Sequence, residues 1–228
     1  MKVTFLGHSG FAVDTGCHVL LFDYCPRRMK RITDPILHTL LDGRSPLVFV
    51  SHVHGDHYDP DIYELNGARF WVGTGVPDQK DAVVMVGGDT FQDEALTVTA
   101  YPSTDEGVAF LVEIDGLTVY HAGDLNWWYW PDEPDPWNPQ MAQTFLSVTE
   151  PLLKQEIDLA FLCADPRQRE GWLFGFDHLM RNGRIRRAVP MHFWNQKSAP
   201  SKVCAAPITE HYRDRIVPLS QLGDSVSL

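Results

Sequence analysis

A short segment, His52-Val53-His54-Gly55-Asp56-His57, carries four metal-ligand side chains within six residues. It directly follows the apolar run Leu47 to Val50, which is typical of a strand covered on both faces. Alternate residues of an extended chain point to the same side, so His52 and His54 can present two imidazoles to one ion. Gly55 permits a sharp turn that brings the following Asp-His pair back toward the same place. The segment therefore predicts a metal site at a strand end, with donors enough for two ions.

A polar, histidine-rich loop without a metal is the alternative interpretation of this segment. Three imidazoles and one carboxylate placed so close together would repel when protonated and would need partners when buried. A single histidine is usually a core or surface residue, but a cluster of this density favours metal binding.

The elements that position this segment follow from hydrophobic periodicity and turn residues. Short apolar or alternating runs predict strands over Val3–Leu6, Phe11–Asp14, Val19–Phe22, Leu47–Val50, Arg69–Val72, Val83–Val86, Leu96–Ala100, Val108–Ile114, Leu117–His121, Leu159–Cys163 and Ala188–Met191. Helical spacing predicts helices over Thr33–Leu41, Pro139–Leu153 and Ser201–Tyr212, and Asp59-Pro60 predicts a further helix start. Asp115-Gly116 is a two-residue hairpin signal.

This order of elements predicts an α/β fold. Strands run in blocks punctuated by helices, so we expect two sheets packed face to face with helices outside. No Ser/Gly-rich linker interrupts the chain, which predicts one domain over residues 1–228. Asn126 to Pro139, rich in Trp and Pro, predicts an irregular aromatic loop.

Composition excludes several classes of protein. The 228 residues are 44% hydrophobic and 21% charged, which is neither disordered nor membrane-spanning in character. A net charge of −11 argues against nucleic-acid or anionic-membrane partners. The four cysteines form no Cys-x-x-Cys pair, and Gly7-His8 arrives before any signal-peptide core could form. We therefore expect a cytoplasmic protein. The sequence does not decide between a monomer and a homo-oligomer.

The motifs resemble those of a known family. His52-x-His54-x-Asp56-His57 matches the signature of the metallo-β-lactamase superfamily. The earlier motif Phe22-Asp23 and the later motifs Tyr120-His121-Ala122-Gly123-Asp124 and Pro190-Met191-His192-Phe193 stand in its order. The opening Leu6-Gly7-His8-Ser9-Gly10-Phe11 is most similar to the branch that includes L-ascorbate-6-phosphate lactonase-like proteins. The resemblance implies an αββα four-layer sandwich, with two mixed sheets flanked by helices.

The resemblance also implies a dinuclear site. The first metal would be bound by His52 and His54, the second by Asp56, His57 and His192, with Asp124 bridging the two. The ions would be one or two divalent metals, zinc first, with manganese or iron as alternatives. Water shared by the pair would be acidified toward a pKa of about 7, which provides a metal-bound hydroxide. Asp56 would be catalytic, orienting that water or taking a proton from the attacked group.

The chain departs from the family in one loop. The histidine that normally completes the first metal site is missing from Tyr101-Pro102-Ser103-Thr104-Asp105-Glu106-Gly107. Asp105 or Glu106 replaces it, or water does, or the first site is weak. An oxygen ligand would shift the preference toward manganese, iron or magnesium. His8 and His121 are further candidates that the sequence cannot place.

Three side chains are candidates for substrate binding. Trp127 and Trp128 follow Asp124, so they would wall a pocket beside the metals or pack inside a long loop. Arg167 follows the strand Leu159–Cys163 and would bind a phosphate, or form an ordinary loop ion pair. The basic run from Arg27 to Arg31 is either a phosphate site or a solvated face.

The leading functional prediction is a metal-dependent hydrolase that uses metal-bound hydroxide on an ester, lactone or phosphoester of a small, in some cases phosphorylated, metabolite. Two alternatives stand beside it: an iron-dependent redox enzyme on the same scaffold, and a non-catalytic binding protein with a degenerate metal site. A nuclease and an exported antibiotic hydrolase are disfavoured by the net charge and by the N-terminal sequence.

Overall fold

The structure, a computed structural model, describes residues 1–25 and 34–228. Its strands are β1 (Lys2–Gly7), β2 (Gly10–Asp14), β3 (Val19–Phe22), β4 (Leu47–Val50), β5 (Arg69–Gly73), β6 (Val83–Met85), β7 (Thr90–Gln92), β8 (Leu96–Pro102), β9 (Val108–Ile114), β10 (Leu117–His121), β11 (Glu156–Cys163), β12 (Arg184–Met191) and β13 (Ser225–Ser227). The α-helices are α1 (Asp34–Leu41), α2 (Trp137–Thr149), α3 (Phe174–Asn182) and α4 (Ala199–Ala205). The basic run from Arg27 to Arg31 lies outside the described residues. None of the described helices has the length and apolarity needed to cross a membrane.

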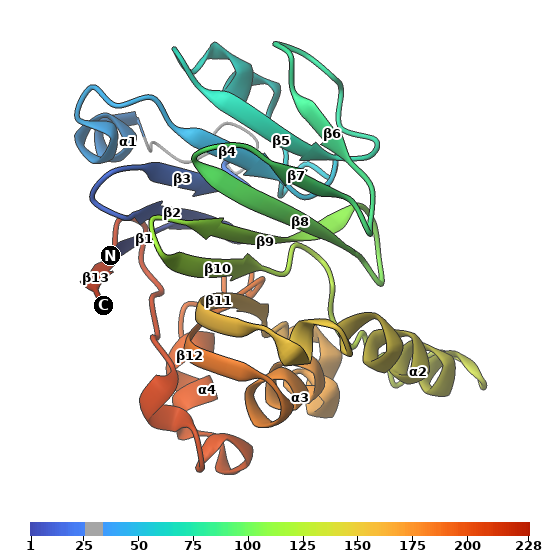
Figure 1. Cartoon of the computed structure of the whole chain (residues 1–228). Coiled ribbons are helices and arrows are strands. Elements are labelled where there is room, and N and C mark those ends of the chain that lie inside the picture. The colour runs from blue at the N-terminus through green and yellow to red at the C-terminus, as the bar shows by residue number, and fades with distance from the viewer. Residues whose placement is uncertain (26–33) are drawn as a thin grey trace.

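Two mixed sheets form the centre of the molecule (Figure 1). One sheet has seven strands in the order β13-β1-β2-β3-β4-β5-β6, and the other has six in the order β12-β11-β10-β9-β8-β7. Strands β3 to β6 are mutually parallel, as are β10, β11 and β12. The expected α/β fold of two mixed sheets flanked by helices is confirmed.

The larger core lies between the two sheets. Strand residues alternate between the two faces of a sheet, so Val3, Phe5, Phe11 and Val13 of β1 and β2 point into this layer. From the facing sheet, aromatic side chains meet them, and the rings of Phe11 and Phe161 stack 4.3 Å apart. Apolar burial of this extent holds the sheets in fixed register and so fixes the strand ends that carry the site.

Helices cover the two outer faces. The intervening residues of the first sheet, such as Ala12 and Leu21, form a second core with Leu37 and Leu40 of α1. Helices α3 and α4 lie beside β11 and β12 at the opposite end of the molecule in Figure 1, and α2 extends to the right of them. The two layers of helices and two of strands are therefore those of an αββα sandwich.

Most element boundaries agree with the sequence-based predictions, and the differences have local causes. The helix expected over Ser201–Tyr212 stops at Ala205 and gives way to a 3₁₀ turn that begins at Pro207, because proline lacks the amide hydrogen that a continuing helix needs. The helix expected over Pro139–Leu153 runs from Trp137 to Thr149. Helix α3 was not predicted. The short edge strands β7 and β13 were not predicted either, since three-residue strands carry little periodicity.

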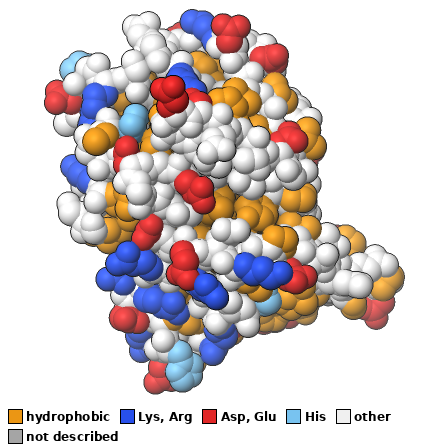
Figure 2. Space-filling model, in the orientation of Figure 1, with side chains coloured by type: hydrophobic (Ala, Val, Ile, Leu, Met, Phe, Trp, Pro, Cys, Tyr) orange, Lys and Arg blue, Asp and Glu red, His pale blue; other side chains and the backbone are white. Residues whose placement is uncertain are grey.

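The basic side chains on one face are compensated by acidic ones. Figure 2 shows Lys and Arg side chains gathered over the lower part of that face. On β12, which lies in this region, Arg184 pairs with Glu156 and Arg186 with Asp158. These pairs offset part of the positive charge on this face.

Candidate metal centre

The segment after β4 is fixed by the carboxylate of Asp23, which follows β3. Because β3 and β4 are parallel neighbours, their carboxyl ends meet at one edge of the sheet. Asp23 accepts hydrogen bonds from the backbone nitrogen and the hydroxyl of Ser51, both at 2.7 Å. It also accepts one from Nδ1 of His57 at 2.7 Å. This buried carboxylate therefore sets the direction of the turn and leaves Nε2 of His57 facing the site.

Two glycines allow the loops of the opposite sheet to reach this turn. Gly123, which follows β10, has a φ of +53°, and a Cβ there would lie 2.7 Å from Cβ of Ser51. Gly107, with a φ of +68°, would place a Cβ 2.0 Å from the carbonyl oxygen of Ser51. Only residues without a side chain permit this approach, and it brings the loops before β9 and after β10 against the histidine segment.

Two groups of ligand atoms form at this junction among the described residues. In each group one atom per residue lies within 4.8 Å of the others. The first group contains His52, His57 and Asp124, and the second contains His8, Asp56, His57 and His192. All of these side chains are buried except that of Asp56, which is partly exposed. Strand ends β1, β4, β10 and β12 thus contribute donors to one place.

The carboxylate of Asp124 belongs to the first group and also lies close to His192 of the second. Its Oδ2 is 3.4 Å from Nε2 of His52. Its Oδ1 is 3.2 Å from Nε2 of His57 and 3.3 Å from Nε2 of His192. The two oxygens of one buried side chain therefore face different imidazoles, which is the arrangement that a carboxylate bridging two ions needs.

His54 stands at the outer rim of the cluster. Its Nδ1 lies 3.0 Å from Nε2 of His52, and its side chain is 44% exposed. On the other side, Nε2 of His54 lies 3.3 Å from Oε2 of Glu106. Asp105 lines the same pocket as His54, and neither of these two side chains belongs to the two ligand groups. The loop that lacks the family histidine thus brings carboxylates to this rim.

Charge coupling across the cluster shifts several pKa values. Burial alone would lower the pKa of His57, but Asp124 and Asp23 raise it to about 9. Burial would raise the pKa of Asp23, yet His121 and His57 lower it to about 2. For Asp124 the neighbouring histidines likewise outweigh burial, and its pKa is lowered. The positive charge of the neighbouring imidazoles therefore holds these buried carboxylates negative, and a bound cation would supply the same kind of charge.

Some of the buried polar atoms that lack a hydrogen-bond partner in the structure are placed where a divalent metal would bind them. They include Nε2 of His57 and Oδ1 of Asp124, two facing atoms in the middle of the cluster. Leaving such atoms unpaired is costly, and a metal ion would satisfy both. Imidazole nitrogens together with carboxylate oxygens form a donor set suited to zinc, iron or manganese.

An aromatic pocket of about 280 Å³ opens onto this cluster. His54, Asp56, Asp124 and His192 line its metal side. Four tryptophans line its walls: Trp128, Trp130, Trp137 and Trp194. A cavity with apolar walls and a few convergent polar groups is typical of a small-molecule site.

Arg167 is the cationic side chain that lines this pocket. Its Nε donates to Oδ2 of Asp165 at 2.8 Å, and its guanidinium lies 4.6 Å from the ring centroid of Trp194. Asp165 in turn accepts from Nδ1 of His192 at 3.1 Å. Asp165 therefore positions both the pocket cation and a candidate metal ligand, a connection that the sequence did not reveal.

The two candidate tryptophans have different surroundings. Trp128 lines the pocket, and its indole nitrogen donates to the carbonyl oxygen of Asp124 at 3.0 Å. Trp127 is not among the lining residues; its ring packs near Phe145 and Phe174, between α2 and α3. A pocket wall therefore accounts for Trp128, and loop packing accounts for Trp127.

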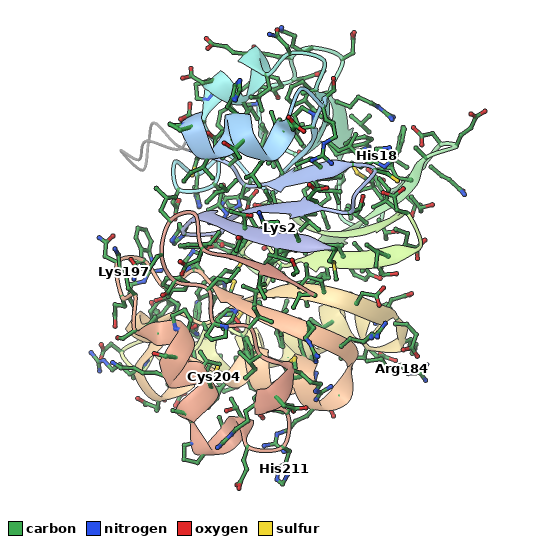
Figure 3. All side chains as sticks on the ribbon, turned by 90° about the vertical axis from the view of Figure 1, so that its left-hand side faces the viewer. Lys2, His18, Arg184, Lys197, Cys204 and His211 are labelled. Carbon is green, nitrogen blue, oxygen red and sulfur yellow. The ribbon has the colours of Figure 1, made fainter. Side chains whose placement is uncertain are left out.

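Sequence reasoning named one residue of the site without placing it and missed another. His8 could not be placed from its motif, and the structure puts it beside Asp56. Trp194 was not considered, although its position two residues after His192 was a usable signal. Two of the other histidines belong to neither ligand group; Figure 3 shows His18 near the upper sheet and His211 at the lower end of the molecule.

Comparison with known proteins identifies the family. Residues 2–128 match the family model of the β-lactamase superfamily domain. A UPF0173 metal-dependent hydrolase of Thermococcus kodakarensis is 28% identical over 142 residues, which are 54% of this chain and 61% of that protein. The chain thus spans about three fifths of the curated relatives that it matches. The finer resemblance to the L-ascorbate-6-phosphate lactonase-like branch stays a prediction.

Solved structures share the fold. Igni18, a metallo hydrolase from Ignicoccus hospitalis, superposes with a TM-score of 0.67 at 18% identity, covering 99% of this chain and 97% of the other. CmlA, a diiron β-hydroxylase from Streptomyces venezuelae, has a TM-score of 0.62 at 13% identity, covering 100% of this chain and 54% of the other. With the family model matched over more than half of its residues, the chain belongs to the metallo-β-lactamase superfamily.

Proposed function

We propose that the protein is a metal-dependent hydrolase of small anionic esters, lactones or phosphoesters. The observation that carries this proposal is the position of Asp124, whose two oxygens face different imidazoles at the end of an aromatic pocket. The relatives named metal-dependent hydrolases support the same reaction class.

We assign two metal sites to the cluster, with zinc as the first candidate metal. His52 and His54 would hold one ion, with Asp105 as an additional oxygen donor, and the second would be held by Asp56, His57 and His192, with Asp124 between the two. When bound, such ions supply Lewis acidity and lower the pKa of water.

The protein's own residues would orient the reactants. Asp56 is the carboxylate of the cluster that is partly exposed, at 20% of its side chain, and it lines the pocket. It can therefore accept a hydrogen bond from a water molecule and hold a proton released during attack. Asp23 and Asp165 fix His57 and His192 through their Nδ1 atoms, so that both Nε2 atoms face Asp124.

The pocket favours a small substrate with a negative charge. Its tryptophan walls suit a flat or apolar group. Arg167 offers a guanidinium to a phosphate or carboxylate, with its Nε and Nη2 already bound to Asp165. The excess of acidic residues over the whole chain makes a nucleic acid an unsuitable substrate.

We further propose that residues 1–228 form a single domain. The larger core contains Val3 from β1 and Leu219 from the C-terminal segment. The rings of Phe5 and Phe193 stack 5.5 Å apart. Each half of the chain would lose its core without the other.

The proposal is tested with the protein purified, stripped of metal and reloaded with zinc, manganese or iron. Metal per chain is measured by elemental analysis, and hydrolysis is followed with carboxylic esters, lactones and phosphoesters of matched size. Metal-dependent turnover that disappears in Asp124→Ala supports the hydrolase. Bound metal without turnover of any of the three classes contradicts it, and absence of bound metal supports the degenerate-site alternative.

An iron-dependent redox enzyme is the second candidate, favoured by one observation. The rim beside His54 is supplied with carboxylates, Asp105 and Glu106, rather than an imidazole. Oxygen donors shift preference from zinc toward iron and manganese. Iron in freshly purified protein, an electron paramagnetic resonance signal and oxygen consumption would favour this candidate; a colourless zinc protein would exclude it.

A further inference from the structure

His8 occupies a strained and buried position at the turn between β1 and β2. Its φ is +52°, in the left-handed region that histidine seldom adopts, and it follows Gly7 with a φ of +109°. The side chain is fully buried. Its ring packs against His192, with centroids 4.3 Å apart, and against Trp194, at 4.7 Å. Backbone strain of this kind persists only where the surrounding structure fixes the residue, and it is concentrated at functional sites.

Neither ring nitrogen of His8 has a hydrogen-bond partner in the structure. Nε2 lies 3.2 Å from Oδ2 of Asp56, yet the contact does not meet hydrogen-bond geometry. The Nε2 atom is buried and the carboxylate oxygen is partly exposed, and one ion at a point between them could contact both. An imidazole buried without a partner is costly, so an occupant of that point is expected.

The spacing of the neighbouring donors fits one metal ion. A tetrahedral zinc ion with bonds of about 2.0–2.1 Å holds its ligand atoms about 3.3–3.4 Å apart. Oδ2 of Asp56 lies 3.2 Å from Nε2 of His8 and 3.8 Å from Nε2 of His57. His192 completes the group, in which all four ligand atoms lie within 4.8 Å of one another.

We propose that His8 is a fourth protein ligand beside Asp56, His57 and His192, in addition to the bridging Asp124, and that it closes this site around a transition metal such as zinc. The inference rests on the metal binding of the proposed function and deepens it. Four protein ligands are typical of closed sites, whereas catalytic sites keep a position open for water or substrate. The His52–His54 site, with His54 at the exposed rim, is then the open and weaker one.

The test is a Zn²⁺ titration of metal-free protein, repeated with Co²⁺ and followed by visible absorption. Wild-type protein should bind a first equivalent tightly and a second more weakly. His8→Asn should weaken the tight phase about 100-fold or more, beyond the 10–100-fold typical of residues that only support a ligand. Asparagine is chosen because it tolerates positive φ. His54→Ala should instead weaken the second phase.

His121→Asn is the burial-matched control. His121 is also fully buried beside the cluster, but its Nε2 donates to the carbonyl oxygen of Ser9 and its Nδ1 accepts from the backbone nitrogen of Gly123. In this variant the tight and the weak phase of zinc binding should both keep their wild-type affinities, and the melting temperature should fall. If His8→Asn behaves in the same way, or weakens both phases equally, the ligand assignment is overturned.

If His8→Asn does not fold, a measurement on the wild-type protein decides whether His8 binds the metal. X-ray absorption at one equivalent of zinc should count three imidazoles, from His8, His57 and His192; a count of two overturns the proposal. Failure of wild-type protein to bind metal contradicts the proposed function itself, so the two failures are distinguishable.

Discussion

The Oδ2 atom of Asp23 lies 2.7 Å from Nδ1 of His57, and this hydrogen bond determines which nitrogen of the imidazole faces the metal cluster. Nε2 of His57 then points to Asp124, at 3.2 Å from Oδ1. Asp23 is not among the residues that line the pocket, so it acts on the site through the groups that it holds, His57 and Ser51.

Asp23→Asn should lower metal affinity by about 10–100-fold, because an amide is a poorer acceptor for the imidazole N–H and leaves His57 less basic. The measurement is a Zn²⁺ titration of metal-free protein. Asp115→Asn is the control, since Asp115 pairs with His18 far from the cluster and should leave zinc affinity unchanged. Equal affinity in Asp23→Asn and wild type would show that His57 keeps its orientation without the carboxylate.

Asp124→Ala should remove bound metal together with activity, because its two oxygens face both groups of imidazoles. Elemental analysis after gel filtration measures the loss. Asp177→Ala serves as the comparison, since Asp177 pairs with Arg181 on α3 and should retain all metal. Retained metal with full turnover in Asp124→Ala would disprove the bridging assignment.

Arg167→Ala should raise KM for an anionic substrate by about tenfold or more while changing kcat little, since a charged hydrogen bond contributes about 1.5–3 kcal/mol. Arg167→Lys should restore only part of the affinity, because lysine lacks the planar guanidinium. Arg169→Ala is a matched control on the same turn, where Arg169 pairs with the exposed Asp132. A fall in kcat at constant KM would place Arg167 outside substrate binding.

The ion pair of Asp14 with Arg44 should make stability depend on pH. Hydrogen bonds from Arg44 lower the pKa of Asp14 below its ordinary value of about 4. The stabilisation is therefore complete above that value and is lost as the pH falls through the lower pKa of the folded state. Asp14→Asn should cost about 1 kcal/mol at pH 7.

Urea unfolding at pH 7 and near pH 2 measures this difference. The gap between Asp14→Asn and wild type should shrink at the acidic pH. Asp132→Asn, which removes an exposed partner, should change stability little at either pH. A gap independent of pH would mean that the carboxylate charge contributes nothing to the pair.

The amino-acid sequence by itself determined the fold class and the positions of the main strands. Runs such as Leu47–Val50 and Val108–Ile114 carry their periodicity within a few residues, and the structure confirms both. The sequence also singled out His52 through the spacing of its own segment, and Asp124 and His192 through the resemblance of their motifs to those of the superfamily. Those signals are readable because they depend on neighbours along the chain.

Only the tertiary structure decided how the distant residues combine. His8 comes from the first turn and Asp56 from the loop after β4, and their 3.2 Å contact depends on the packing of two sheets. The link from Arg167 through Asp165 to His192 joins the ends of β11 and β12, which are parallel neighbours. Such contacts leave no periodic pattern in the chain, because strand order and register set which side chains meet.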